Sequence, residues 1–389
     1  MRFFHLAASV TSGMLLMANI FAQSDSTASQ KKMKFLGFAD AYYSYDINTA
    51  NNTDRGILIN YASPFYNHTA HNHIAVNNIL AGVKYEHEIF RLSGILQYGT
   101  FVQKNYAAEP ASSKYIYEAL AGIKLIKGLW LEAGIFTSHI GLESAISIDN
   151  YVLTRSLSAE NTPYFESGAK LTYTTPDDKW LFSGLVLNGW QNIQAFQRAQ
   201  KAWGTQVKFK PFGEKLILNS STYFGPAPVP FVITDKSGSV TGTDMTRGGE
   251  FLMRYFHNFY IIYEVSPKLT VAFSFDAGFQ EKSSINKTLG SWFNPTFLVK
   301  YELTSRLAVN GRLEHYNDPT GIVIPTGTAG NFVATGASLG LDFAPLENVK
   351  FRIEARSIKS IDKIFINQQQ GKGADLNTFF TTSIAVKVP

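Results

Sequence analysis

Residues 269–280 read Leu-Thr-Val-Ala-Phe-Ser-Phe-Asp-Ala-Gly-Phe-Gln, in which apolar side chains alternate with smaller or polar ones. One face would carry Leu269, Val271, Phe273, Phe275, Ala277 and Phe279. A period of two residues is that of a β-strand whose two faces meet different surroundings. The same period recurs in residues 115–125, 292–301, 350–356 and 380–388. The sequence therefore predicts an all-β chain.

The composition narrows the class of protein. The chain has 389 residues, 45% of them hydrophobic, and a formal net charge of +5. Such a chain is too apolar and too weakly charged to be disordered. With no cysteine, it has neither a disulfide framework nor a cysteine zinc site. The small charge excess and the lack of a Lys/Arg cluster indicate no nucleic-acid partner.

The two faces of the expected strands suggest a membrane barrel. Tyr115 and Tyr117 lie at one end of an apolar face, and Trp203 and Phe209 mark both ends of another. Aromatic residues at both ends of strands form the girdles of transmembrane barrels. The opposite faces carry charged and hydroxyl side chains, which suit a wet interior. A soluble secreted β-sandwich also alternates, and it remains the alternative fold.

The connections predict the strand number. Short turn signals recur at 86–88, 126–128, 176–179, 211–214, 266–268, 304–306 and 345–348. They alternate with longer polar stretches. Seven turns pair fourteen strands, and strands near 34–47 and 375–388 bring the total to sixteen. We expect a transmembrane antiparallel β-barrel of about 16 strands, with short periplasmic turns, long extracellular loops and a bore wide enough for water.

The N-terminus has the pattern of a secretory signal peptide. Arg2 precedes a mostly apolar stretch, and Ala22 offers a small residue for cleavage. The alternative is an uncleaved anchor, but the apolar stretch is shorter than a spanning helix requires. We therefore expect a signal peptide at 1–22, a short periplasmic segment at 23–33 and a transmembrane barrel at 34–389. The chain would be exported to the bacterial outer membrane.

Several short stretches carry a family resemblance. They are Asp40–Asp46, Gly134–Glu143, Asp149–Tyr151, Arg155–Ser156, Pro163–Lys170 and Asn188–Trp190. In this order and spacing they resemble the β-barrel porins of Bacteroidetes of the porin-2, OmpL-like type. Two departures are Ile135, where a lysine is expected, and the ending Val388-Pro389, where barrels usually end on an aromatic residue. The second bears on recognition by the assembly machinery more than on the fold.

The resemblance implies an outer-membrane barrel of porin function without a cofactor. We expect a water-filled channel for passive diffusion of small hydrophilic solutes. Its partners would be outer-membrane lipid, those solutes and the barrel assembly machinery, and a homo-oligomer is compatible with the resemblance. The alternatives are a non-conducting barrel that acts as an adhesin or structural protein and, less favoured, a barrel-embedded hydrolase.

The connection at 137–163 is the longest one within about 130–190, where the family resemblance is most specific. We expect it to fold inward and narrow the pore, with Arg155 facing acids across the constriction; an ordinary outer loop with solvated charges is the alternative. The candidates for the pore lining and constriction are Glu143, Asp149, Arg155, Lys170, Arg254, Arg312, Glu314 and Arg352. Both signs are mixed along the expected inner faces, which predicts at most a weak anion preference. A second reading makes Arg352, Glu354 and Arg356 a stabilising ladder on the inner wall.

Two further motifs are candidates for a metal site and a catalytic site. His68, His71 and His73 could bind zinc or copper, but no acid or cysteine stands beside them, and we expect no metal. Gly336–Gly340 matches the nucleophile-elbow pattern, which requires a strand-to-helix turn. It lies in an expected strand with no helix after it. We therefore predict no catalytic residue.

Overall fold

The computed structural model describes residues 32–49, 54–56, 63–194, 200–228, 231–234, 240–244, 251–282, 287–367 and 371–388. The expected signal peptide (1–22) and all but the last two residues of the expected periplasmic segment (23–33) lie outside these residues. Among the described residues, no helix is long and apolar enough to cross a bilayer.

Sixteen antiparallel strands close into one barrel, which confirms the predicted fold and strand number. In barrel order they are β1 Lys32–Asp46, β2 Ile74–Glu86, β3 Phe90–Tyr98, β4 Ile116–Ile126, β5 Leu129–Thr137, β6 Phe165–Thr174, β7 Trp180–Leu187, β8 Ala202–Phe209, β10 Leu216–Pro228, β13 Phe251–Ser266, β14 Leu269–Glu281, β15 Leu289–Glu302, β16 Leu307–Asp318, β17 Phe332–Leu346, β18 Val349–Ser360 and β21 Leu376–Val388.

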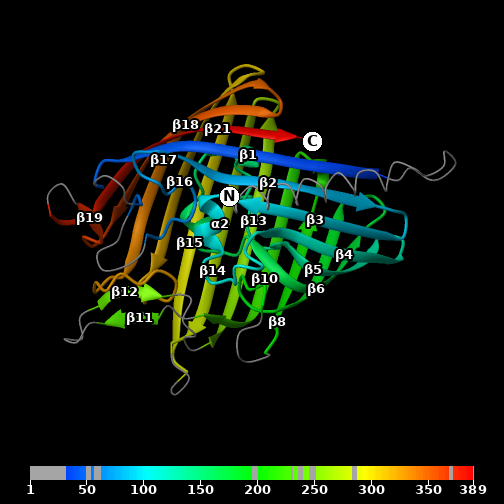
Figure 1. The fold of residues 1–389 in the computed structure, drawn as a ribbon, viewed down its shortest axis with the longest axis horizontal. Helices are drawn as coiled ribbons and strands as arrows, with labels where there is room; N and C mark the ends of the chain where they lie inside the picture. Colours follow the sequence, from blue (N-terminus) through cyan, green and yellow to red (C-terminus); the bar gives the residue numbers. More distant parts are fainter. Residues whose placement is uncertain are drawn as a thin grey trace, which may run out of the picture.

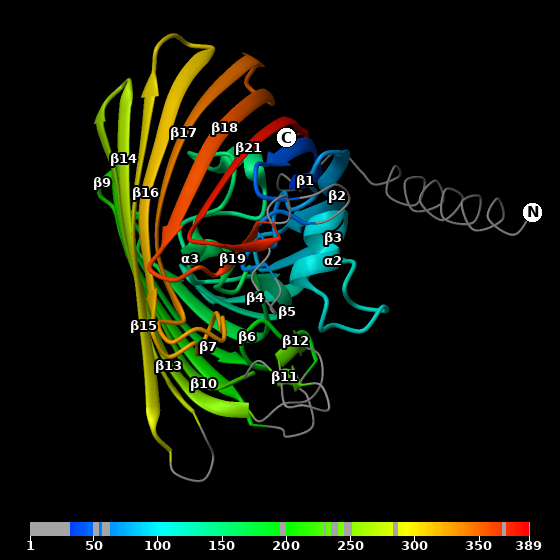
Figure 2. The same cartoon turned by 90° about the vertical axis from the view of Figure 1, so that its left-hand side faces the viewer.

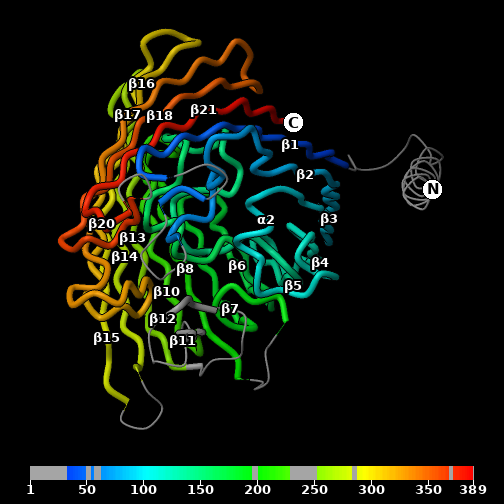
Figure 3. The backbone as a smooth tube through the Cα atoms, turned by 60° about the vertical axis from the view of Figure 1, so that its left-hand side comes forward, coloured from blue at the N-terminus to red at the C-terminus, as the bar shows by residue number. Residues whose placement is uncertain are grey.

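The barrel is sealed where its first and last strands meet. β1 pairs with β21 from Gly37 opposite Val388 to Asp46 opposite Phe379. Figures 1 and 3 show the two strands side by side, blue beside red. Closure leaves no free sheet edge, so the backbone groups of every strand find partners within the wall.

Short elements lie between the barrel strands. They are the strand β9 Pro211–Glu214, the hairpins β11 Phe231–Thr234 with β12 Val240–Asp244 and β19 Phe365–Asn367 with β20 Lys372–Ala374, the helices α2 Thr100–Asn105 and α3 Leu157–Glu160, and the 3-10 turn η1 Ser147–Asp149. α2 overlaps the end of 89–103, a stretch in which apolar and polar residues do not alternate regularly. Figure 2 shows α3 between opposite walls of the barrel.

The predicted alternation is present in the wall. In β14, Phe273 and Phe279 are exposed on the outer face, whereas Ser274, Asp276 and Gln280 are buried on the inner face. The same division holds along β15, β18 and β21. An apolar outer face suits lipid, and a polar inner face suits a hydrated interior.

One aromatic residue does not follow the predicted face. Tyr117 was expected on the outer face with Tyr115, but it is buried among apolar side chains inside the barrel. The pairing of β3 with β4 shifts here, from Ile95 opposite Glu118 to Leu96 opposite Ile116. A bulge of this kind gives one strand an extra residue and turns the side chains after it to the other face.

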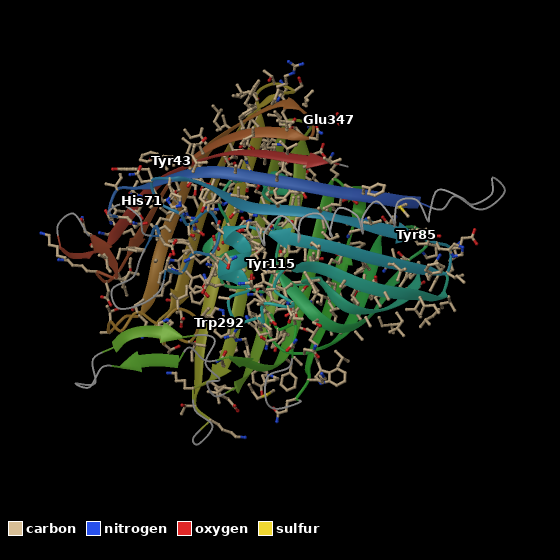
Figure 4. All side chains as sticks on the ribbon, viewed as in Figure 1. Tyr43, His71, Tyr85, Tyr115, Trp292 and Glu347 are labelled. Atoms are coloured by element: carbon tan, nitrogen blue, oxygen red, sulfur yellow. The ribbon has the colours of Figure 1, made fainter. Side chains whose placement is uncertain are left out.

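The two ends of the barrel can be followed in Figure 4. Tyr85 lies near the end of β2, and His71 lies just before its start, at the opposite end of the barrel. The Tyr85 end, which we call the turn end, also carries the junctions between β2 and β3, β4 and β5, and β17 and β18. The start of β1 and the end of β21 lie at this end as well.

Candidate functional site

The interior of the barrel is crossed by the chain between β5 and β6, which we call the crossing segment (residues 138–164). It leaves the wall where Ser138 N donates to Tyr164 O at 3.0 Å. Within it, Ser156 caps α3, because its side chain accepts from Ala159 N. Most of the segment is buried, and Val152, Thr154, Arg155 and Leu157 are fully buried.

Two glutamates of the wall hold the backbone of the crossing segment. Glu354 on β18 accepts from Thr154 N at 2.6 Å and from Thr154 Oγ1 at 2.9 Å. Glu314 on β16 accepts from Leu157 N at 2.6 Å. Carboxylates that accept from backbone N–H groups form strong, charge-assisted hydrogen bonds.

Two arginines of the same strands hold the carbonyl groups. Arg312 donates to Thr154 O at 2.6 Å, and Arg356 donates to Arg155 O at 2.8 Å. The four wall residues also pair with one another, since Arg312 lies 2.9 Å from Glu354 and Arg356 contacts Glu314. Arg312, Glu314, Glu354 and Arg356, which we call the docking quartet, are all at most 3% exposed.

A glycine makes this pairing sterically feasible. Gly336 on β17 stands between Glu314 on β16 and Ile358 on β18. A Cβ atom at this position would lie 2.7 Å from Glu314 Oε1, which is closer than real Cβ contacts allow. The missing side chain therefore leaves room for the Glu314 carboxylate.

Arg352, a predicted lining residue, is also covered by the crossing segment. Its guanidinium pairs with Asp342 at 2.8 Å and donates to Ser147 O at 2.9 Å and to Tyr151 O at 3.1 Å. It is 2% exposed. Arg352, Arg312 and Glu314 thus attach the segment to the wall, and their side chains are not open to solvent.

The sequence predicted that Arg155 faces acids across a constriction, and the structure shows a different arrangement. It is fully buried, and its guanidinium donates to Ser144 O at 2.8 Å, Ala145 O at 2.8 Å and Leu153 O at 3.2 Å. Within the described part of the chain, its hydrogen-bond partners are these backbone carbonyls. A segment that crosses the interior desolvates its own carbonyl groups, and these need donors.

The other candidates lie in different surroundings. Arg254 stacks against Trp190 and Trp292 and donates to Gln280 at 2.6 Å. Glu143 accepts from the backbone N–H and the hydroxyl of Ser156. Asp149 is exposed and pairs with Lys387 on β21 at 2.7 Å.

Lys170, the remaining candidate, borders an open cavity of about 340 Å³ in the wall formed by β1 to β6. The charged residues that line it are Lys34, Lys84, Glu86, Arg91, Glu118, Glu132 and Lys170. Of these seven residues, only Lys170 was among the constriction candidates predicted from the sequence. Arg91 falls in 89–103, whose weak alternation gave no reliable facing.

The histidine cluster has separate hydrogen-bond partners. His68 Nε2 lies 2.8 Å from Asp40 Oδ2, His71 Nδ1 accepts from Asp46 N, and His73 Nδ1 lies 3.0 Å from His71 O. No group of three metal-ligating side chains occurs among the residues that the structure describes.

Burial shifts the pKa of two groups in the crossing segment. Burial lowers the pKa of His139 to about 4, and its Nε2 lies 2.9 Å from Thr222 O. Burial raises the pKa of Glu160, although Arg55 and hydrogen bonds from Asn67 and Tyr66 N oppose this. Desolvation penalises the charged form of each group. His139 is therefore neutral at pH 7.

Sequence comparison places the whole barrel in one family. Residues 32–388 match the family model described as "Putative beta-barrel porin-2, OmpL-like". No curated protein sequence matches the chain.

Solved structures share the fold at low sequence identity. OmpT of Vibrio cholerae, an outer membrane protein in its trimer form, has a TM-score of 0.60 and 9% identity over 92% of this chain and 100% of its own. An anion-selective porin from Comamonas acidovorans has a TM-score of 0.57 and 9% identity over 92% and 100%. OmpF of Salmonella typhi, in complex with daunomycin, has a TM-score of 0.54 and 11% identity over 92% and 98%.

Proposed function

Because the chain belongs to the β-barrel porin-2, OmpL-like family, we propose that it forms a water-filled channel in the bacterial outer membrane for the passive diffusion of small hydrophilic solutes. The fold and the family are those of outer-membrane porins. The main support is the closed barrel of sixteen strands with an apolar outer and a polar inner face. Barrels of this size leave room for an aqueous channel.

The crossing segment would narrow this channel to the part of the bore that it leaves open. The docking quartet holds the segment against β16 and β18, and the charged cavity lies in the wall of β1 to β6. Solutes would therefore pass along β1 to β6. The charges of both signs there support at most a weak anion preference, which we propose for this chain.

The turn end would face the periplasm, and the longer connections would face the outside. An even number of strands places the start of the first strand and the end of the last strand at the same side of the membrane, as in bacterial outer-membrane barrels. The chain would contact outer-membrane lipid and the barrel assembly machinery. A homo-oligomer is part of the proposal, since the similar structure of OmpT from Vibrio cholerae is a trimer. We propose no enzymatic activity.

A second function, a non-conducting adhesin or structural barrel, is favoured by one observation. The end of the barrel opposite the turn end holds buried apolar side chains of inner segments, such as Phe65 and Phe101. If these segments seal the bore, no solute passes. Conductance separates the two functions.

The test is electrical recording of the purified chain in planar lipid bilayers, with a heat-unfolded sample as the control. A porin gives stepwise conductance in KCl that scales with salt concentration, and liposomes that contain it swell in small sugars. A folded barrel that gives neither steps nor swelling contradicts the porin function and supports the non-conducting one.

A further inference from the structure

The charged cavity in the wall of β1 to β6 is built from two neighbouring rows of side chains. In the first row, Arg91 on β3 stands opposite Gly122 on β4, and Gly122 stands opposite Glu132 on β5, which stands opposite Lys170 on β6. Arg91 meets Glu132 at 2.7 Å and Lys170 meets it at 3.5 Å, so one carboxylate lies between two cations.

Gly122 leaves a gap in this row between Arg91 and Glu132, because glycine has no side chain. A Cβ atom at Gly122 would lie 2.8 Å from Glu132 Cγ and 3.2 Å from Arg91 Cγ. Arg91 and Glu132 therefore meet across β4, because its residue at this register has no side chain. The arrangement is that of Gly336 in the docking quartet, but here Arg91 keeps 31% of its side chain exposed.

The second row has an excess of positive charge. Lys34 on β1 stands directly opposite Lys84 on β2, and Lys84 pairs with Glu118 on β4 at 2.9 Å. The Lys84 side chain is 46% exposed although it points into the barrel. Because Lys84 lies two residues before the end of β2, this exposed side chain lines the mouth of the barrel at the turn end.

Aromatic rings hold two of the cations in place. The guanidinium of Arg91 lies 4.3 Å from the centre of the Trp130 ring, and Lys170 Nζ lies 4.7 Å from that of Phe136. A cation over an aromatic face is stabilised without losing its charge. Both side chains therefore keep their positive charge beside the cavity.

The balance of charge around the cavity is slightly positive. The four cations Lys34, Lys84, Arg91 and Lys170 face the three acids Glu86, Glu118 and Glu132, which leaves an excess of one positive charge. The docking quartet adds nothing to this balance, because the crossing segment covers it. A permeating ion would therefore meet the rows on β1 to β6.

We propose that these two rows are the charge filter of the pore, and that the Lys34–Lys84 pair gives it a preference for small anions, carboxylate-bearing solutes among them. This inference rests on the proposed porin function. Glu118 moderates the preference, since it neutralises Lys84 in part, and Glu132 compensates Arg91 and Lys170. The arginines of β16 and β18 act on the position of the crossing segment and contribute little to ion selectivity.

The test is the reversal potential across a KCl gradient in planar bilayers. Lys84→Glu should lower the chloride-to-potassium permeability ratio by about threefold or more, since it reverses a charge beside the path. Glu118→Gln should raise the ratio, because it frees Lys84. The matched control is Lys359→Glu, because Lys359 pairs with Asp375 on the outer face near the opposite end of the barrel, is 60% exposed, and undergoes the same change of charge.

Each outcome decides the inference. Opposite shifts for Lys84→Glu and Glu118→Gln, with none for Lys359→Glu, support it. If the variants conduct with the wild-type chloride-to-potassium permeability ratio, the two rows are not the charge filter, and the proposed porin function still stands. A wild-type barrel without conductance overturns both. If Lys84→Glu does not fold, Glu118→Gln decides alone, since an unchanged or lowered ratio contradicts the proposal.

Discussion

The inner wall carries charges of one kind in two very different states. On β16 and β18, Arg312 and Arg356 are 1% exposed and hold the crossing segment. On β2 and β3, Lys84 and Arg91 point into the same barrel but keep 46% and 31% of their side chains exposed. Facing alone therefore does not set the role of an inward charge. A charge that the crossing segment covers holds that segment to the wall, whereas a charge left uncovered can meet solutes.

The largest difference between the two regions should appear on removal of one arginine from each. Arg312→Leu leaves the buried Glu354 without its paired cation, while Glu314 keeps Arg356, and breaking a buried pair costs about 3–5 kcal/mol. Arg91→Leu removes a partly exposed partner of Glu132 and should cost about 1 kcal/mol or less. The measurement is the free energy of unfolding in denaturant with lipid vesicles.

The Arg312→Leu variant should also release the crossing segment. We expect faster proteolysis within residues 138–164 and a larger, noisier conductance, whereas Arg91→Leu keeps the wild-type cleavage pattern. Equal losses of stability in the two variants would contradict the division of the wall into a docking region and an open region.

A smaller effect should follow from acidification. The pKa of His139 is lowered to about 4 by burial, whereas an unfolded chain titrates near 6.5. Between these values the unfolded state binds a proton that the folded state does not. The contribution of His139 to the free energy of unfolding is therefore fully present above about pH 6.5 and is lost as the pH falls towards 4. The loss is on the order of 2–3 kcal/mol.

The test compares unfolding free energies at pH 7 and pH 4.5. The titratable groups near His139 are Glu166, 4.0 Å from its Nδ1, and Lys170. His139→Gln keeps a donor for Thr222 O but does not titrate, so its loss on acidification should be smaller than that of the wild type. The matched control is the same substitution on the exposed outer face, His257→Gln. If His139→Gln loses as much stability as the wild type, the assignment fails.

Much of the fold could be predicted because the alternation within one strand shows which of its side chains share a face. The alternation in residues 269–280 and 350–356 matches the observed burial of β14 and β18. The turn signals gave sixteen strands, as observed. The failure at Tyr117 has a local cause, since a bulge depends on how two strands pair and not on one strand alone.

The site was less predictable, because alternation gives the face of a residue and not its depth. Arg312, Glu314 and Arg352 were expected to line the pore; they lie on the inner wall, and nothing in β16 or β18 shows that residues 138–164 cover them. Arg155 was expected to face acids, but its partners are carbonyls of its own segment. Contacts between residues about two hundred positions apart depend on the closed barrel.

The smallest effects should come from two glycines that occupy equivalent places in the two regions. Gly122→Ala puts a methyl group 2.8 Å from Glu132 Cγ, but both Glu132 and Arg91 line the open cavity, and Arg91 keeps 31% of its side chain exposed and can move. Gly336→Ala puts it 2.7 Å from Oε1 of Glu314, whose carboxylate is held in place by Leu157 N at Oε2 and by Arg356 at Oε1. We expect about 1–3 kcal/mol of destabilisation for Gly336→Ala. For Gly122→Ala we expect less than about 0.5 kcal/mol, since alanine suits a strand better than glycine.

Unfolding in denaturant measures both glycine variants, and the reversal potential reports on the filter. Gly122→Ala should shift the permeability ratio less than Lys84→Glu, because the charges stay and only their spacing changes. Gly336→Ala should leave the ratio unchanged. A larger loss of stability for Gly122→Ala than for Gly336→Ala would show that the row on β3 to β6 is as tightly packed as the docking quartet, and the open path would then have to lie elsewhere in the bore.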